Sequence, residues 1–203
     1  MTMTDKGQTD RSTLITTRRN FVLTGGAAVA GISALNFLGG PATAAVAKRQ
    51  LKASGDGDVG ILQGALALEM EGIAAYTIAG GSGLLTPGTL KVALVFLGHH
   101  KAHRDSLANL IIKAGGKPVE PKTDAEYTAN LNLGALKSEG DVVRLAAGLE
   151  QGAANAYVGQ VAALKDRSTA HLFAQLSTDE AVHWAVLSGA LGDSVPAEPY
   201  LFG

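Results

Sequence analysis

Apolar residues recur every three or four positions along four stretches of this chain, which is the spacing of amphipathic helices. The stretches cover about residues 58–80, 86–114, 138–165 and 169–191. Little of the sequence after residue 58 alternates as a strand would. The pattern therefore predicts an all-α fold built from four long helices.

Residues typical of helix ends mark the borders of these stretches. Thr86 is a predicted N-cap, and Pro87 occupies the first helical position. Gly115-Gly116 is expected to end the second helix, and Ser138 to open the third. The two prolines of KPVEPK exclude a continuous helix between them.

The lengths of the connections predict how the helices are arranged. Short loops join the first helix to the second and the third to the fourth, whereas about 22 residues join the second to the third. A helix of ~25 residues is ~38 Å long, and the longer connection can cross that length. The order short, long, short is typical of an antiparallel four-helix bundle with one long crossover between helices two and three.

The first and third helices share a repeated motif. ALEMEGIAAYT contains Glu69 and Tyr76, and GLEQGAANAYV contains Glu150 and Tyr157, in each case seven residues apart. Seven residues rotate by ~700° in a helix, so each pair lies on nearly one face, two turns apart.

The second and fourth helices correspond as well. HKAH at residues 100–103 aligns with EAVH at residues 180–183. His103 follows Glu69 by 34 residues, and His183 follows Glu150 by 33. The two helical hairpins therefore look like copies of one unit.

With these motifs the chain resembles the ferritin-like superfamily, particularly its rubrerythrin-like and bacterial ferritin-like branches, over residues 58–191. That family carries a Glu on each of two helices and Glu-x-x-His on each of the other two, all directed into the core. The resemblance implies hydrogen bonds from Tyr76 and Tyr157 to ligand carboxylates, although both could equally be core aromatics. The metal ligands that it implies are Glu69, His100, His103, Glu150, Glu180 and His183.

Position 100 departs from the family, which has a bridging carboxylate where this chain has His100. Three carboxylates do not neutralise two divalent ions, so one or two ions are expected. Two ions would be bridged by Glu180 and a solvent oxygen, whereas one ion would make the site asymmetric. His99 paired with His103 is an alternative at i, i+4, but the alignment of the repeats favours His100.

Carboxylate and imidazole ligands suit iron, which we expect first, and also manganese and zinc. With two irons, the resemblance implies oxidase-like or peroxidase-like activity. The alternatives are a metal protein without turnover and a metal-free bundle that serves an envelope stress response or binds a protein. In a further alternative there is no metal site, because slightly rotated helices turn Glu69, Glu150 and Glu180 toward solvent. Glu71 is expected to be a solvated charge.

The N-terminal region has the pattern of an export signal. Thr17-Arg18-Arg19-Asn20-Phe21 precedes an apolar run to Leu38, and Ala42-Thr43-Ala44 and Ala45-Val46-Ala47 follow. The region resembles a twin-arginine signal, which implies cleavage after Ala44 or Ala47 and a periplasmic protein. We therefore expect a signal peptide at residues 1–47 and a bundle with an extended C-terminal tail at residues 48–203. The alternative interpretation of the apolar run is a membrane anchor. If it is an export signal instead, we expect the protein to contact the membrane only through this signal.

The amino-acid composition excludes several other kinds of site and partner. The chain has no cysteine, which excludes disulfides, thiolate metal sites and a rubredoxin-like iron site. Its formal net charge of −1 gives no nucleic-acid footprint. Metal ions are the expected partners, and the sequence leaves open whether the chain forms a homo-oligomer.

Overall fold

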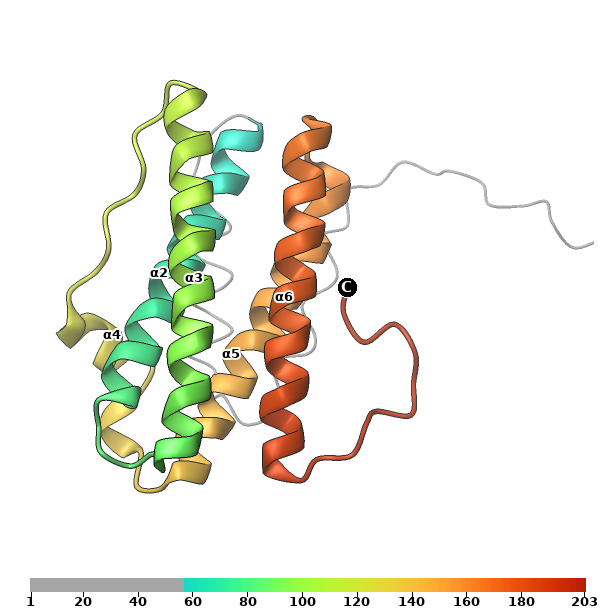
Figure 1. Ribbon diagram of the computed structural model, residues 1–203. Coiled ribbons are helices and arrows are strands. Elements are labelled where there is room, and N and C mark those ends of the chain that lie inside the picture. The colour runs from blue at the N-terminus through green and yellow to red at the C-terminus, as the bar shows by residue number, and fades with distance from the viewer. Residues whose placement is uncertain (1–56) are drawn as a thin grey trace, which may run out of the picture. The chain divides into compact units, whose positions relative to one another are not determined.

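The computed structural model describes residues 57–203, whose four long helices form two hairpins (Figure 1). The first hairpin consists of α2 (Asp58–Gly80) and α3 (Pro87–Lys113), and the second of α5 (Glu139–Gln160) and α6 (Arg167–Leu191). No strand occurs within residues 57–203. The predicted all-α bundle is confirmed, whereas the predicted signal at residues 1–47 lies outside the described residues.

Side-chain caps hold the starts of three of the four long helices. The hydroxyl of Thr86 accepts a hydrogen bond from the Thr89 amide at 3.4 Å, and Ser138 accepts one from the Asp141 amide at 3.2 Å. Asp166 caps α6 in the same way. Each cap satisfies an amide that has no partner within its helix. The starts predicted from Thr86-Pro87 and Ser138 are therefore correct.

The crossover contains a short helix that the sequence analysis did not predict, α4 (Asp124–Asn130), followed by a 3₁₀ turn, η1 (Leu133–Ala135). A capping box opens α4: Thr123 and Glu126 each bind the other's backbone amide. Leu131 and Leu133 then pack with Ala75 and fasten the crossover to α2. Residues 123–126 have the T-x-x-E signature of a helix start, so the sequence did hold the signal for α4.

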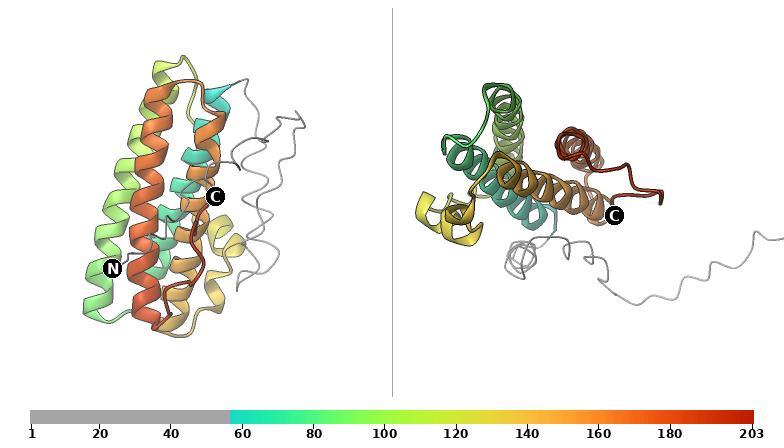
Figure 2. Two further views of the ribbon diagram at one scale, coloured as in Figure 1. Left: turned by 90° about the vertical axis from the view of Figure 1, so that its right-hand side faces the viewer. Right: turned by 90° about the horizontal axis from the view of Figure 1, so that it is seen from below.

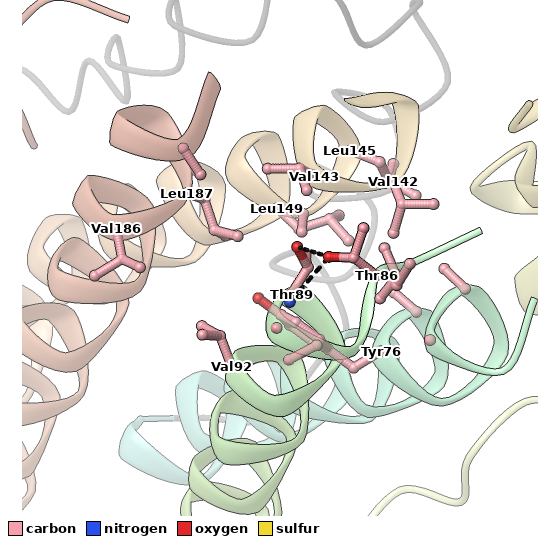
Figure 3. Close-up of a pocket in the computed structure, with 18 residues that line it drawn as sticks. Tyr76, Thr86, Thr89, Val92, Val142, Val143, Leu145, Leu149, Val186 and Leu187 are labelled. Atoms are coloured by element: carbon pink, nitrogen blue, oxygen red, sulfur yellow. Dashed lines mark hydrogen bonds between the residues drawn. The ribbon is translucent and has the colours of Figure 1, made fainter. Parts of the chain in front are cut away.

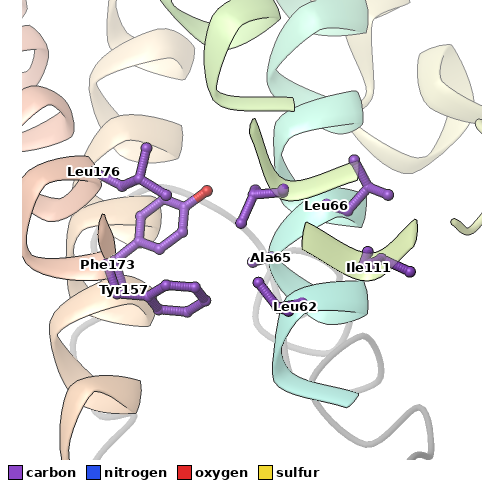
Figure 4. Packing of buried hydrophobic residues seen from close by; sticks show 8 residues of the cluster. Leu62, Ala65, Leu66, Ile111, Tyr157, Phe173 and Leu176 are labelled. Atoms are coloured by element: carbon purple, nitrogen blue, oxygen red, sulfur yellow. The ribbon is translucent and has the colours of Figure 1, made fainter. Parts of the chain in front are cut away.

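Two apolar clusters fill the bundle on either side of its middle. Tyr157 and Phe173 pack edge to face at 5.3 Å in one of them (Figure 4). The other lies around Tyr76 and Phe96. Each fully buried leucine or isoleucine contributes about 1.5–3 kcal/mol. The first cluster is formed by Leu62, Ala65, Leu66, Leu107, Ile111, Tyr157, Phe173 and Leu176.

The C-terminal segment after α6 has no regular structure and returns along the second hairpin (Figure 2). The ring of Phe202 meets Trp184 edge to face at 5.3 Å, and the amide of Gly203 donates to Asn155 at 3.0 Å.

A second 3₁₀ turn, η2 (Val161–Ala163), joins α5 to the loop before α6. Among the helices of residues 57–203, none is both long and apolar enough to cross a membrane.

Candidate metal centre

Six acidic and imidazole side chains meet in the middle of the bundle. Each of the four long helices contributes at least one, and every one of the six is at most 7% exposed. The interpretation in which the glutamates face solvent is therefore wrong. The six residues are those that the repeat singled out: Glu69, His100, His103, Glu150, Glu180 and His183.

The side chains form two groups, and in each group one donor atom per residue lies within 4.8 Å of all the others. His100 and Glu180 belong to both groups. Glu69 and His103 complete the first group; Glu150 and His183 complete the second. Each group thus combines one carboxylate and one imidazole of its own with two shared residues.

In the first group, His103 Nδ1 lies 3.1 Å from Glu180 Oε1 and 3.5 Å from Glu69 Oε1. His100 Nδ1 lies 2.8 Å from Glu69 Oε2 and 3.7 Å from Glu180 Oε1. Ligand atoms at about 2.1 Å from one ion are about 3.0–3.4 Å apart in octahedral or tetrahedral geometry. The donor atoms therefore have roughly the spacing of a coordination shell.

The second group repeats this arrangement. His183 Nδ1 lies 3.0 Å from Glu180 Oε2 and 3.5 Å from Glu150 Oε2, and His100 Nε2 lies 3.1 Å from Glu150 Oε1. Glu150 Oε2 is buried without a hydrogen-bond partner in the described part of the chain. A buried carboxylate oxygen without a partner is costly, and a cation would satisfy it. The residues thus fit a metal ion.

The histidines and glutamates alter each other's pKa. Burial alone would raise the pKa of Glu69 and Glu150, but hydrogen bonds from the neighbouring imidazoles outweigh burial and lower both. Burial would lower the pKa of His100, but Glu150 and Glu69 raise it to about 11. For His103, Glu180 and Glu69 likewise outweigh burial and raise the pKa to about 10. Without metal, the side chains of His100 and His103 are therefore positively charged imidazolium ions at neutral pH.

Two tyrosines hold the carboxylates that are not shared. The hydroxyl of Tyr76 donates to Glu150 Oε1, and that of Tyr157 donates to Glu69 Oε1. Burial raises the pKa of both phenols, so both remain protonated donors.

The ring nitrogens that face away from the site also have partners. His103 Nε2 lies 3.2 Å from Asp179 Oδ2, and His183 Nε2 lies 2.9 Å from His99 Nδ1. The ring of Phe96 stacks on His183 at 4.0 Å. Such contacts fix the orientation of a ligand imidazole. The exposed His99 therefore contacts His183 from outside the site. Of the two candidate histidines, His100 is the one that lies in the centre.

A comparison with protein families identifies the fold. The sequence model of the family described as "Ferritin-like domain" matches residues 57–193, which include all six central residues. The chain belongs to this family.

A solved structure supports the same fold at low sequence similarity. The ferritin-like domain is similar to the crystal structure of a conserved hypothetical protein from Mycobacterium tuberculosis, with a TM-score of 0.55 and 20% identity. The similarity covers 77% of this chain and 98% of the other. No curated protein matches the chain.

One carboxylate of the ferritin-like domain differs from expectation. Glu71 is 7% exposed, and its Oε2 has no hydrogen-bond partner among residues 57–203, so its prediction as a solvated charge was wrong. Burial raises its pKa, which the nearby charge of Lys122 partly offsets. The unpredicted α4 packs against α2 and explains the burial.

A cavity of about 330 Å³ adjoins the site of the ferritin-like domain at Tyr76 (Figure 3). Side chains from all four long helices line it, and Val143 and Leu149 of α5 are among them. Its walls are mostly apolar, with the hydroxyls of Thr86 and Thr89 as exceptions. Because Tyr76 both lines the cavity and binds Glu150, it lies between the cavity and the ligand cluster.

Proposed function

We propose that this ferritin-like domain belongs to an exported metalloprotein that binds one or two transition-metal ions, iron first, between its four helices. The observation that carries the proposal is the pair of buried donor groups that share His100 and Glu180. Manganese and zinc suit the same carboxylate and imidazole ligands. The proposed ligands are Glu69, His100, His103, Glu150, Glu180 and His183.

Charge supports the proposal. Glu69, Glu150 and Glu180 are each at most 1% exposed, and buried carboxylates require compensating positive charge. Divalent ions supply it at short range, and they also satisfy the orphaned Oε2 of Glu150.

Iron in this site would supply redox chemistry toward dioxygen or peroxide, which is the oxidase-like or peroxidase-like activity that the family resemblance implies. The chain's own residues hold the ligands in place. Tyr76 and Tyr157 fix the carboxylates that are not shared, and Asp179 orients His103. Phe96 covers the ring of His183 and excludes water from that side.

A metal-free bundle that acts in envelope stress or in protein interaction is the second candidate, and one observation favours it. Both ring nitrogens of His100 already contact carboxylates, at 2.8 Å from Glu69 and 3.1 Å from Glu150. Three imidazolium ions would balance three carboxylates without any metal.

Metal content per chain distinguishes the two candidates. The exported protein is isolated from the periplasm of its own host, and its metals are measured by elemental analysis. We expect one or two ions per chain, falling below a tenth of an ion in the double variant Glu150→Gln, Glu180→Gln. The exposed pair Glu120→Gln, Glu198→Gln is the matched control and should keep the wild-type content. Unchanged metal in the first variant would exclude this site, and metal-free wild-type protein would favour the second candidate.

A further inference from the structure

The imidazole of His100 lies between the two donor groups and directs a different nitrogen to each. Nδ1 is 2.8 Å from Glu69 Oε2 in the first group, and Nε2 is 3.1 Å from Glu150 Oε1 in the second. His103 and His183, in contrast, each direct only Nδ1 to the centre, because their Nε2 atoms contact Asp179 and His99.

We propose that His100 bridges two metal ions, binding one through Nδ1 and the other through Nε2. This inference rests on the proposed metal-binding function and adds the number of ions and the way they are joined. In the metal-free protein the His100 imidazolium carries an N–H at each ring nitrogen, and each faces a carboxylate. As each ion binds, one N–H bond breaks, its proton passes to solvent and a nitrogen–metal bond forms, so the two ions together release two protons.

The bridge restores the charge balance that a carboxylate at position 100 would provide. The three glutamates supply three negative charges, and the bridging imidazolate supplies the fourth. Four negative charges neutralise two divalent ions, as four carboxylates would. The replacement of a carboxylate by histidine therefore need not reduce the number of ions.

Glu180 is the second shared residue and fits the same two-ion arrangement. Its Oε1 lies 3.1 Å from His103 Nδ1, and its Oε2 lies 3.0 Å from His183 Nδ1. Because the two oxygens already face different groups, the carboxylate can bind each ion through one oxygen in an extended mode, which spans a longer separation than a compact carboxylate bridge that shares its ions with a solvent oxygen.

Gly72 makes room for the ring of His100. A Cβ atom at position 72 would lie 3.3 Å from both Cε1 and Nδ1 of His100, closer than ordinary van der Waals contact. The ring of Tyr76, about one turn further along α2, lies 5.3 Å from the ring of His100 at an angle of 36°. Gly72 and Tyr76 thus hold the imidazole between the two groups.

The separation of the ions distinguishes this bridge from the family's usual one. With metal–nitrogen bonds of about 2.0–2.1 Å on both sides of an imidazole, the ions are about 6 Å apart. Ions joined by carboxylate and solvent oxygens are about 3.5–4 Å apart. The difference is large enough to measure directly.

The test uses the metal-stripped full chain and zinc alone. Calorimetric titration gives the number of ions, and anomalous diffraction from zinc-loaded crystals gives their positions. We expect two ions about 6 Å apart, on opposite sides of the His100 ring. Two ions about 3.5–4 Å apart, or a single ion, would overturn the bridge and leave the proposed function intact. Absence of bound zinc, together with metal-free protein from the host, would overturn both.

Variants at position 100 provide a second test. His100→Glu should keep two ions and shorten their separation to about 3.5–4 Å, because a carboxylate replaces the longer bridge. In His100→Gln the ring with its two nitrogen ligands is absent, so no bridge can form. The stoichiometry should fall from two ions to one. The exposed His171→Gln is the control and should bind zinc as the wild type does. Two ions at an unchanged separation in both His100 variants would overturn the bridge.

Discussion

Tyr157 donates its hydroxyl hydrogen to Glu69, a residue of the other hairpin, rather than to the glutamate of its own helix. Tyr76 makes the equivalent contact to Glu150 in the opposite direction. The repeated motif is therefore used across the bundle: each hairpin supplies the tyrosine that fixes the other's carboxylate. This exchange links the two hairpins at the site itself.

Removal of either hydroxyl should weaken the site. Tyr157→Phe leaves a buried oxygen of Glu69 with one hydrogen bond fewer, which should cost about 1–3 kcal/mol of the free energy of unfolding without metal. Zinc affinity should fall about tenfold, because the carboxylate loses its orientation. Urea unfolding and zinc competition with a chelator measure the two effects. Tyr200→Phe, at 96% exposure, is the control. Wild-type values for Tyr157→Phe would show that the phenol does not support the ligand.

The sequence was sufficient to predict the bundle, because helix borders depend on local signals such as Thr86-Pro87 and Ser138. It was also sufficient to select six residues that the structure brings together, since two copies of one spacing place them on inward faces. The prediction of Glu71 as a solvated charge was wrong for the opposite reason. Its burial depends on α4, a distant segment in which no helix was expected.

Contacts between side chains of different helices could not be predicted from the sequence. Spacing could place His100 on the inward face, but the direction of its two nitrogens depends on Gly72 and on carboxylates from two other helices. Asp179 was missed because its contact with His103 joins α6 to α3, and no local motif encodes that pairing.

Asp179 should act as a positioning residue for His103. Asp179→Ala removes the group beside Nε2, so the ring loses its fixed orientation, and metal affinity should fall about 10–100-fold. Competition between the full chain and a zinc chelator measures the change. Asp179→Asn should recover part of the affinity, because an amide oxygen can still accept from the ring. An affinity of Asp179→Ala equal to that of the exposed control Asp193→Asn would contradict this role.

Gly72→Ala should affect the second ion more than the first. The added methyl group meets the His100 ring at 3.3 Å and should displace it from its position between the groups. We expect about a tenfold loss of affinity for the second zinc ion in a calorimetric titration. Gly148→Ala is the matched control, because apart from the nearby backbone of its own helix no atom lies within 4 Å of its Cβ position. That control should stabilise the helix by about 0.5–1 kcal/mol and leave zinc binding unchanged. Equal zinc binding by the two variants would show that the ring does not need the space.

Export can be tested on the N-terminal signal. If Arg18 and Arg19 form a twin-arginine signal, Arg18→Lys with Arg19→Lys should leave the precursor in the cytoplasm at its full 203-residue length. Cell fractionation and the mass of the purified chain measure location and cleavage. Arg11→Lys lies in the same region outside the motif and should be exported normally. Periplasmic accumulation of the double variant would contradict the export proposal without affecting the metal site.

The charged cluster should make stability and metal affinity respond to pH in opposite directions. The folded-state pKa of His100 is about 11 and that of His103 about 10, against an ordinary value of 6.5. A raised folded-state pKa stabilises the metal-free protein fully below pH 6.5, and this contribution is lost as the pH rises through 10 and 11. Metal ions compete with the same protons, so zinc affinity should instead increase over that range.

Urea unfolding of the metal-free full chain at pH 7 and pH 10 tests the first part, with His100→Gln as reference. The difference in unfolding free energy between the wild type and His100→Gln should shrink at pH 10, because at that pH only the wild type must take up a proton at position 100 in order to fold. Groups that titrate outside the central cluster cancel in this difference, since both proteins contain them in the same surroundings. Zinc competition at pH 6 and pH 8 tests the second part and should show tighter binding at pH 8. A wild-type advantage that grows with pH would show that His100 is neutral in the metal-free protein.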